Sequence, residues 1–450
     1  MRFAGFVIVV VVVTLGGTSR VWAQTNEEAF EQFQWQMATP GAKATAMGGA
    51  FLASTNEVSA AIANPAGLTA GGRLRGSVEF GSVDFRIDRL GAIDSLLTGA
   101  VRRSGDTING VPFAGIVIPL PGDRVTIAMA RHQRLAYRDS FHMAPRVVPG
   151  LVGLARATSP VDSAIDIRGV SYAASVGVAL LPNVHVGLTV SADRLRADVL
   201  NTKHNIVVGS SPLDITETAI VTNQSRINDG DTGAGLTVGA TYQPARTVSV
   251  GLVFSKGPSF HVSEDFLLNP GRLSGVNQPL ASEDGFPTRI SLNIPDRLSA
   301  GVSVRPHARL MLAFDATHIT YSDLAKGLTP VFAHDLVSGD DYAISNGTEL
   351  HGGGEFNVGS DAKPVFLRAG VFTNPDHRLQ FVGTVRPGAD ITPAQAQRTN
   401  AIEAAVFNLG NHDTQVAGTV GVGLALGRHA QADAAYVWKQ KLVVSLSLGL

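Results

Sequence analysis

The sequence predicts an all-β protein, a transmembrane antiparallel β-barrel of about fourteen strands with an N-terminal plug inside its lumen. Three observations predict it. From about residue 73 the chain alternates apolar and polar residues with a period of two. The breaks between these stretches alternate between short turns and long polar loops, an asymmetry typical of outer-membrane barrels. No apolar run after the N-terminus reaches the roughly 20 residues that a membrane helix needs.

The N-terminus has the pattern of a secretory signal peptide. Met1 and Arg2 precede an apolar run from Phe3 to Leu15, and the small residue Ala23 ends a suitable cleavage site before Gln24. The alternative, a membrane anchor, is disfavoured because the run is well short of the roughly 20 residues that span a bilayer. We therefore expect residues 1–23 to be removed and the protein to be exported. The absence of cysteine is compatible with an oxidising compartment.

Residues 24–72 are the expected plug. The stretch "EEAFEQFQWQM" is compatible with a helix, and "PGAKATAMGGAFLASTNEVSAAIANPAGLTAGG" is dense in glycine and alanine. Small residues let backbone pack closely in a confined lumen. Pro65 restricts Asn64 to an extended or turn conformation, so the Asn-Pro pair predicts a rigid corner near the point where the chain leaves the plug and joins the barrel wall.

Residues 73–450 are the expected barrel. Each short break is rich in the residues of tight turns, as in "PLPGD" and "LLPNV", while long breaks cover 87–110, 137–165, 198–227, 261–289, 322–347 and 374–413. An even number of strands places both termini on the periplasmic side. The predicted strands are 73–86, 111–119, 122–136, 166–181, 183–197, 228–243, 246–260, 290–305, 307–321, 348–359, 363–373, 414–427, 429–438 and 441–450.

Each predicted strand has one apolar face. In "VSYAASVGVALL" the residues from Val170 to Leu180 with even numbers are apolar, and "RLMLAFDATHITY" separates Leu312 and Phe314 from Asp315 in the same way. A soluble β-sandwich or propeller would also alternate. We disfavour it because these strands are longer than the five or six residues or so that are usual, and because the long loops fall on one edge only.

Composition and motifs exclude several functions. With 16% charged residues and a net charge of -1, the chain is not expected to bind nucleic acid. Its twelve histidines show no HExxH or other close metal spacing. "GVSYA" and "GVSVR" lack the second glycine of a serine-hydrolase elbow. We therefore expect no metal, no cofactor and no enzyme activity.

Five charged residues fall opposite the apolar faces and should point into the lumen, where each needs a partner: Asp193, Asp315, Glu355, Arg368 and Asp433. The simpler interpretation is a salt-bridge network that holds plug to wall. The alternative is that Arg368, flanked by Phe366 and Phe372 on its own face, binds a carboxylate head with an apolar tail.

Phe30, Phe33 and Trp35 in the plug extension, together with Phe51, could line a ligand pocket or only pack the plug against the wall. All these assignments assume an unbroken register, and one β-bulge would invert it.

The stretch "PGAKATAMGGAFLASTNEVSAAIANPAGLT" resembles the N-terminal signature of the FadL family of outer-membrane transporters for long-chain fatty acids and other hydrophobic compounds, and residues 294–324 are similar to a second family stretch. The resemblance implies a fourteen-stranded barrel closed by an N-terminal hatch, with Asn64, Pro65 and Ala66 as hatch-motif positions. It also implies that substrate leaves through a gap in the wall into the membrane. The long N-terminal extension and the C-terminal Leu450 depart from the family pattern.

The predicted function is thus passive, hatch-gated import of a long-chain fatty acid or another hydrophobic small molecule by a monomer in contact with outer-membrane lipid. Fatty acids, aromatic hydrocarbons and alkanes all need the same apolar lining, so the sequence does not identify which of them is the substrate. Two other classes are a secretion-associated or structural barrel resembling PorV-type subunits, which would bind a protein partner, and an outer-membrane lipid hydrolase, which the missing serine motif disfavours.

Overall fold

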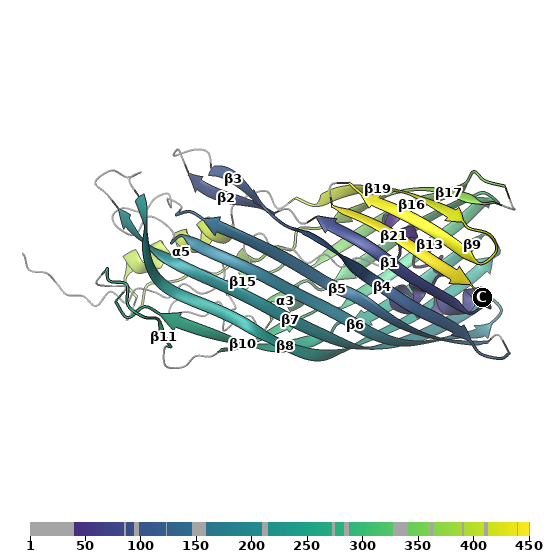
Figure 1. The fold of residues 1–450 in the computed structure, drawn as a ribbon, viewed down its shortest axis with the longest axis horizontal. Coiled ribbons are helices and arrows are strands. Elements are labelled where there is room, and N and C mark those ends of the chain that lie inside the picture. The colour runs from purple at the N-terminus through teal and green to yellow at the C-terminus, as the bar shows by residue number, and fades with distance from the viewer. Residues whose placement is uncertain are drawn as a thin grey trace, which may run out of the picture.

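A computed structural model describes residues 40–449 apart from 85–86, 94–98, 123, 146–158, 209–214, 272–274, 283–287, 327–340, 361–362, 389–390, 409–412 and 439. It is a closed antiparallel barrel whose wall has 14 strands (Figure 1). The last strand pairs with the first, from Arg75 opposite Gly449 to Val83 opposite Lys441. The wall strands are β1 (Arg75–Asp84), β4 (Thr107–Pro119), β5 (Val125–Met143), β6 (Val161–Leu181), β7 (Val184–Val208), β8 (Ile215–Ala245), β9 (Val248–Lys256), β13 (Arg297–His307), β14 (Leu310–Ile319), β16 (Gly347–Asn357), β17 (Val365–Asn374), β19 (Gln415–Ala425), β20 (Ala430–Val437) and β21 (Lys441–Gly449).

The two ends of the barrel differ. At one end, which we call the turn end, neighbouring strands are joined by a few residues, as between Leu181 and Val184. At the other, the loop end, the connections are long except for the one between Val437 and Lys441. Figure 1 places the C-terminus at the turn end, beside the N-terminal helices. The predicted fold class, an all-β antiparallel barrel, is confirmed.

Alternation sets the two faces of the wall. On β6, Tyr172 is 57% exposed on the outside while its neighbour Ser171 is fully buried inside. On β14, Phe314 is 50% exposed and Asp315 is 1% exposed. The outside is therefore apolar and the inside polar, as expected for a wall that faces lipid.

Several strands run further toward the loop end than predicted. The described parts of the predicted loops 137–165 and 198–227 are mostly continuations of β5, β6, β7 and β8. The predicted loop 87–110 contains a hairpin of β2 (Ile87–Ile93) and β3 (Gly99–Ser104) as well as the start of β4. These extensions keep the period of two, but charged residues replace aliphatic ones on their outer face. A strand with two polar-looking faces cannot be told from a loop by hydrophobic pattern alone.

Two predicted strands are broken. The stretch 246–260 divides at Gly257 and Pro258 into β9 and β10 (Ser259–Leu268), and 290–305 divides around Pro295 into β12 (Thr288–Asn293) and β13. Proline has no N–H to donate to the ladder, and it sits at both breaks. A short strand, β11 (Ala281–Ser282), pairs with the far end of β10.

The described part of the plug, residues 40–72, lies inside the turn end of the barrel (Figure 1). It contains α1 (Ala42–Ala46), α2 (Ala60–Ala63) and the 3-10 helix η2 (Pro65–Gly71). Helix α1 contacts β17, β19, β20 and β21, and η2 contacts β5, β6, β7 and β8. The segment therefore touches opposite sides of the wall at once.

Inward-facing glycines make room for this segment. A Cβ on Gly239 would come 2.1 Å from Asn64 Oδ1, and a Cβ on Gly187 would come 2.3 Å from the carbonyl carbon of Pro65. Gly353 and Gly370 leave similar space beside Met47. Wall glycines thus let the plug backbone approach the strands closely, which a side chain would prevent.

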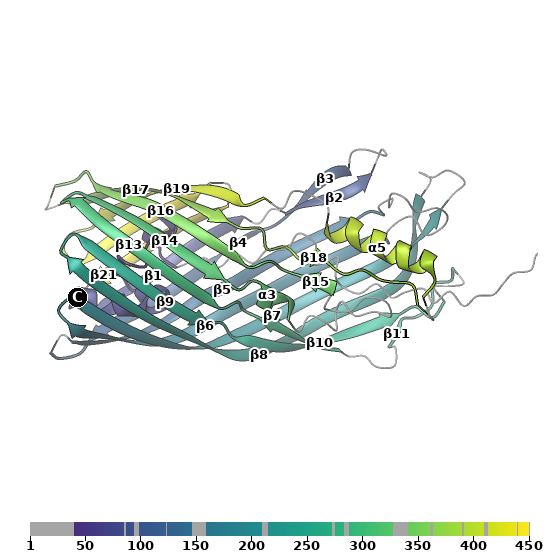
Figure 2. The same cartoon turned by 180° about the vertical axis from the view of Figure 1, so that it is seen from behind.

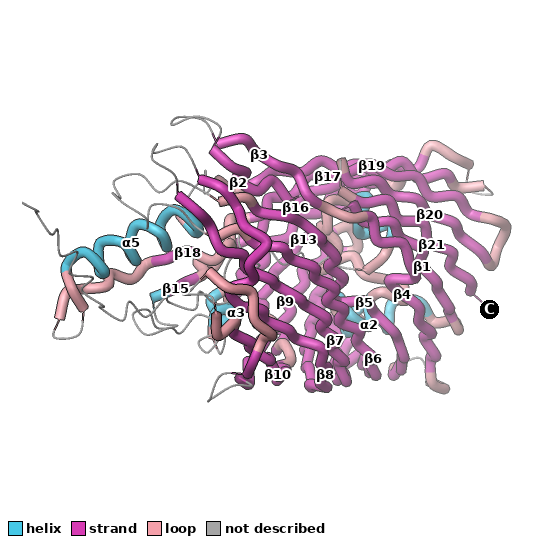
Figure 3. Tube along the Cα trace, turned by 60° about the vertical axis from the view of Figure 1, so that its left-hand side comes forward, coloured by secondary structure: helices cyan, strands magenta, loops and turns pink. Residues whose placement is uncertain are grey.

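The connection after β17 lies at the loop end of the barrel (Figure 2). This connection contains β18 (Gln380–Phe381), which pairs with β15 (Tyr342–Ala343), and the helix α5 (Pro393–Phe407). The short helix α3 (Ser322–Ala325) follows β14. Figure 2 and Figure 3 show α5 lying across the loop end, far from the plug.

Candidate functional site

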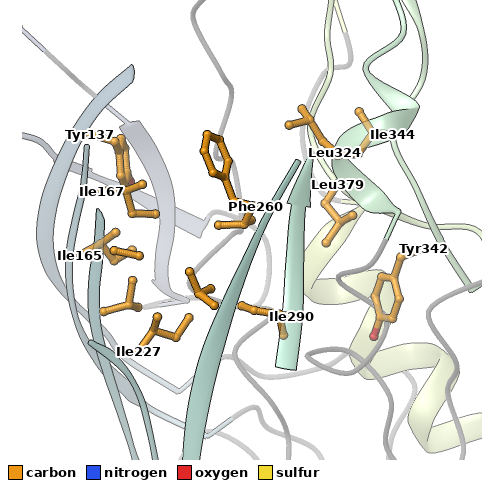
Figure 4. Packing of buried hydrophobic residues seen from close by; sticks show 14 of the residues in the cluster. Tyr137, Ile165, Ile167, Ile227, Phe260, Ile290, Leu324, Tyr342, Ile344 and Leu379 are labelled. Atoms are coloured by element: carbon orange, nitrogen blue, oxygen red, sulfur yellow. The ribbon is translucent and has the colours of Figure 1, made fainter. Parts of the chain in front are cut away.

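The loop end of the lumen holds the largest apolar cluster among the described residues. Wall residues such as Ile165, Ile167 and Ile227 face it from one side, and Leu324, Tyr342 and Leu379 from the connections on the other (Figure 4). All of these are buried. A lumen lined this way near its mouth favours an apolar solute over water.

Local interactions hold α5 over this cluster. Thr392 and Gln395 form a capping box at its N-terminus, so the helix begins in a fixed place. Tyr342 donates a buried hydrogen bond to Glu403 at 2.8 Å. The Asn400 side chain bonds both backbone groups of Val385. The helix is therefore fastened to neighbouring loops through side chains.

Below the cluster, a cavity of about 160 Å³ lies between the plug and the wall. Plug residues Leu52 and Ile62 contribute to its lining, with Val253 and Phe372 of the wall. Since the plug forms part of this lining, any movement of the plug changes the shape of the cavity.

Two cations in this cavity have no close partner among the described residues: the acids that act on them from a distance are Glu349 for Arg297 and Glu79 for Lys441. Arg297 of β13 and Lys441 of β21 line it, and neither makes a hydrogen bond or an ion pair within the part of the chain that the structure describes. Arg134 also lines the cavity, but it donates to Asp193 at 2.9 Å. Asp315 and Glu349 line the same cavity, but Asp315 is bound by N–H groups of the plug and Glu349 by Tyr321 and His351. A half-buried cation without an ion-pair partner is costly, so the surroundings of Arg297 and Lys441 favour an anionic group.

Wall side chains bind the plug through its backbone. Asp315 accepts from the N–H groups of Phe51 and Leu52 at 2.6 and 2.9 Å. Thr419 donates to the Ala46 carbonyl at 2.9 Å, and Thr189 to the Ala61 carbonyl at 2.8 Å. The plug has little regular structure of its own, so these wall groups satisfy backbone atoms that would otherwise be buried unpaired.

The Asn-Pro corner joins plug and wall. Asn64 is fully buried; its amide donates to the Leu52 carbonyl at 2.8 Å and to Thr241 of β8 at 3.2 Å. Its Oδ1 accepts from the Ala66 N–H at 3.2 Å, and Pro65 occupies the first position of η2. The corner thus begins η2, and Gly72, with φ of 54°, ends it.

Arg368 lies on the opposite side of the plug from the cavity. It donates to Glu355 at 2.7 Å and to Asp433 at 2.6 Å, and Lys43 of the plug lies 3.6 Å from Glu355. Phe366 packs under the guanidinium, 5.3 Å from its carbon. Arg368 thus joins three wall strands through two carboxylates, and Lys43 connects this charge network to the plug.

Of the other predicted site residues, Phe372 and Phe51 lie where plug and wall meet. Phe372 lines the cavity and stacks on His351, whose Nδ1 bonds the Gly48 carbonyl. Phe51 is buried under Lys43, 5.6 Å from its ammonium. Phe30, Phe33 and Trp35 lie outside the described residues. Sequence reasoning missed Arg297 and Lys441. Lys441 is the first residue of a predicted strand, where its face is uncertain, and Arg297 lies in the predicted strand 290–305, which the structure breaks at Pro295 just before it.

The hydrogen-bond ladder between β4 and β5 is interrupted, and we call this interruption the wall gap. The two strands pair from Pro119 opposite Thr126 to Phe113 opposite His132, and no further. Beyond that point β4 pairs only with β1 and β5 only with β6. Phe113 is about 20 Å along the strand from the turn end, so at the usual tilt the gap begins about 15 Å up the wall.

A β-bulge in β5 lies at the lower edge of this gap. Pairing with β6 shifts between Gln133 and Leu135, which leaves Arg134 as the extra residue. Below the bulge His132 faces inward, and above it Leu135 and Tyr137 do. The Arg131 guanidinium donates to the free Val111 carbonyl of β4. His132 and Arg134 both line the cavity, so gap and cavity are adjacent.

Other kinds of site are not seen in the described part of the chain. Its His, Asp and Glu residues form no group of three or more that could hold a metal ion. Separately, none of its helices is both long and apolar enough to span a bilayer.

A plugged, closed barrel with an apolar mouth, a lumenal cavity and a wall gap defines a membrane channel protein for apolar solutes. Residues 24–376 match the model of the outer membrane protein transport protein family (OMPP1/FadL/TodX), and the chain belongs to this family of outer-membrane transporters for hydrophobic compounds. Proteins of this family are transport channels and not enzymes. No curated protein matches the sequence significantly.

Solved structures share the fold. A FadL homologue from Pseudomonas aeruginosa is 15% identical with a TM-score of 0.61, over 92% of this chain and 99% of that one. The toluene transporter TbuX of Ralstonia pickettii is 13% identical with a TM-score of 0.56, over 92% and 99%. The toluene transporter TodX of Pseudomonas putida is 12% identical with a TM-score of 0.56, over 92% and 97%.

Proposed function

We propose that this protein imports long-chain fatty acids or chemically similar amphipathic acids by passive diffusion, with the loop end outside the cell and both termini in the periplasm. Solute enters through the apolar cluster at the loop end, rests in the cavity above the plug, and leaves sideways between β4 and β5 into the membrane. The segment where β4 and β5 are not paired, beside the cavity, carries this proposal, because an exit there would not require the solute to cross the plug.

The lining of the cavity supports an acid over a neutral hydrocarbon. Apolar side chains such as Val253 and Phe372 suit an acyl chain, which gains about 0.8 kcal/mol for each buried methylene. Arg297 and Lys441 offer the carboxylate a partner that toluene could not use. The relatives named above as toluene transporters leave aromatic solutes as the alternative to be tested.

The plug is proposed to gate the path. It contributes Leu52, Ile62 and Gly49 to the cavity and is held by single hydrogen bonds from many wall residues. Such bonds contribute about 1 kcal/mol each, so the plug can shift at low cost. In this proposal the shift disrupts the lining of the cavity and releases the solute. In this proposal Asn64, Pro65 and Ala66 fix the point about which the plug moves.

The wall gap can be closed chemically, because the chain has no cysteine of its own. A Cβ on Gly110 would lie 3.7 Å from Gln133 Oε1 across the gap. We would join Gly110→Cys and Gln133→Cys with a short bis-methanethiosulfonate reagent in cells without another transporter. Ile118→Cys with Ile127→Cys, which face each other in the paired part of the same strands, is the control.

Oleate uptake should fall to background in the linked Gly110/Gln133 variant and return when dithiothreitol removes the link, while the control pair keeps its uptake. Undiminished uptake in the linked variant would refute lateral exit between β4 and β5. Toluene uptake with no oleate uptake would change the proposed substrate class from fatty acids to aromatic hydrocarbons. If neither solute enters cells through a correctly folded barrel, a barrel that binds a protein partner becomes the better hypothesis.

A further inference from the structure

The outer surface of β6 and β7 changes abruptly from apolar to cationic. From the turn end, outward residues are apolar as far as Val170 on β6 and Ala192 on β7. The next outward positions are Arg168 on β6 and Arg194 and Arg196 on β7, all exposed. From Leu180 to Val170 is about 33 Å along the strand, or about 25 Å of height at the usual tilt, which is the thickness of the apolar band of such barrels. The three arginines therefore lie where hydrocarbon gives way to headgroups.

These arginines are placed against each other. Arg168 is directly opposite Arg196 in the β6–β7 register, and Arg194 is opposite Val170. Like charges in directly opposed positions are destabilising. Arg194 and Arg196 make no hydrogen bond or ion pair with any described residue. An anion between the strands would remove this repulsion.

Carboxylates on the same face do not neutralise the row. Asp166 lies one outward position further toward the loop end, and Arg138 and Arg168 share it, with contacts of 3.2 and 2.6 Å. Asp198 is opposite Asp166 in the register. Asp106 also lies 3.6 Å from Arg138. The charged groups at this level are thus Arg138, Arg168, Arg194 and Arg196 against Asp106, Asp166 and Asp198, which leaves an excess of positive charge, with Arg194 and Arg196 on the membrane side of the carboxylates.

A groove runs directly below the arginines. Its floor is made by small outward residues, Ala114, Ala174 and Ala192, and its rims by Met129, Tyr172 and Val190. The rim residues are 64%, 57% and 51% exposed. Because Tyr172 is opposite Ala192 and the next position on β7 is Arg194, the groove reaches the arginine row without interruption. Apart from Arg131 and Ser191 its lining is apolar, which suits an acyl chain.

We propose that this surface, the arginine face, binds the phosphorylated glycolipid of the outer leaflet, with phosphate groups on Arg168, Arg194 and Arg196 and one acyl chain in the groove. Arginine pairs with phosphate through two parallel hydrogen bonds, so three of them on a rigid sheet can hold phosphates in fixed positions. The proposal rests on the transport orientation given above, in which the loop end faces outward. Transport and lipid binding are measured separately, so either can fail without the other.

The test is lipid titration of the purified barrel in mild detergent, followed by native mass spectrometry. The probes are bisphosphorylated lipid A, its monophosphorylated form, phosphatidylglycerol and inorganic phosphate. Variants are Arg194→Gln with Arg196→Gln, and Ala192→Trp to fill the groove. The matched control is Arg246→Gln with Arg428→Gln, which removes two exposed arginines from the turn end. Resistance of the barrel to unfolding in cold detergent verifies the fold of each variant.

We expect bisphosphorylated lipid A to bind wild type and the turn-end control alike, and to bind the arginine variant about tenfold or more weakly, because the variant loses two charge-assisted contacts to phosphate. The monophosphorylated form should bind more weakly than the bisphosphorylated one, and Ala192→Trp should weaken both. Equal binding by the arginine variant would overturn the proposal. Equal affinity for phosphatidylglycerol would show that the surface binds anionic lipids in general and would overturn specificity for the glycolipid. Binding of inorganic phosphate alone would show that the groove holds no acyl chain. If the double variant does not fold, Arg194→Lys, which keeps the charge but loses the paired hydrogen bonds, gives the same comparison.

Discussion

The carboxylate of Asp315, in the middle of β14, accepts the backbone N–H of Phe51 at 2.6 Å, which ties the plug to the wall beside the lumenal cavity. The same oxygen accepts the N–H of Leu52 at 2.9 Å. These two bonds to one buried charge are among the strongest of the plug contacts, because charge-assisted hydrogen bonds exceed neutral ones.

Asp315→Ala should therefore loosen the plug without unfolding the barrel. We expect a loss of about 2–3 kcal/mol in plug docking, since both N–H groups lose a charged acceptor. Faster hydrogen exchange at the Phe51 and Leu52 amides and a larger single-channel conductance would show it. Thr317→Val is the control, because Thr317 bonds Ser299 of the neighbouring strand and not the plug. Unchanged exchange at both amides would contradict this role of Asp315.

Gly239→Ala should displace the corner at Asn64. The added Cβ would come 2.1 Å from Asn64 Oδ1, so plug or strand must shift, at a cost of about 1–3 kcal/mol. Limited trypsin digestion at Lys43 should become faster in the folded barrel. Gly418→Ala is the control, because a Cβ there would meet nothing within 4 Å. Equal protection of Lys43 in both variants would show that the close contact does not hold the plug in place.

Arg368→Met should lower the thermal stability of the barrel strongly. It leaves Glu355 and Asp433 buried without their main cation, and breaking a buried pair costs about 3–5 kcal/mol. The triple variant Arg368→Met, Glu355→Gln, Asp433→Asn should recover much of the loss, because no unpaired charge remains. The unfolding temperature in detergent measures both. Failure of the triple variant to recover would mean that packing and not charge dominates at this site.

Docking of the plug should tighten as pH falls. Burial raises the pKa of Glu57 in the plug, an effect that Lys43 only partly offsets. A carboxyl group whose pKa is raised on docking binds its proton more readily when docked, so docking is favoured below the raised pKa and weakened as pH rises through it. Protection of Lys43 from protease should therefore fall as pH rises from the ordinary carboxyl range. Glu57→Gln should flatten the profile, whereas Glu217→Gln, far away on β8, should leave it unchanged; a Glu57→Gln profile as steep as wild type would assign the effect to another group.

Much of the fold follows from local sequence. A residue on a strand faces lipid or lumen according to its position in an alternating pattern, so Tyr172 and Phe314 could be placed outside and Asp315 inside before any contact was known. The turn-forming residues in the short breaks predicted the connections at the turn end. The loop end was harder, because β7 and β8 continue past the membrane with charged outer faces that resemble a loop.

The candidate site depended more on tertiary structure. The Asn-Pro corner could be recognised, but its bonds to Leu52 and Thr241 join parts of the chain that are far apart. The pairing of Arg368 with two carboxylates was one of two interpretations open from its pattern. Arg297 and Lys441 meet at the cavity only because the barrel closes.

By itself, then, the sequence determined that this chain forms a plugged antiparallel barrel, because alternation and turn chemistry act over a few residues and need no knowledge of distant partners. Only the tertiary structure decided where β4 and β5 separate, which cations stay unpaired in the lumen, and that Arg168 stands opposite Arg196. The physical reason is register: each of these features is set by which residue of one strand lies beside which residue of the next, and a single bulge such as that at Arg134 shifts the rest of the strand to the other face.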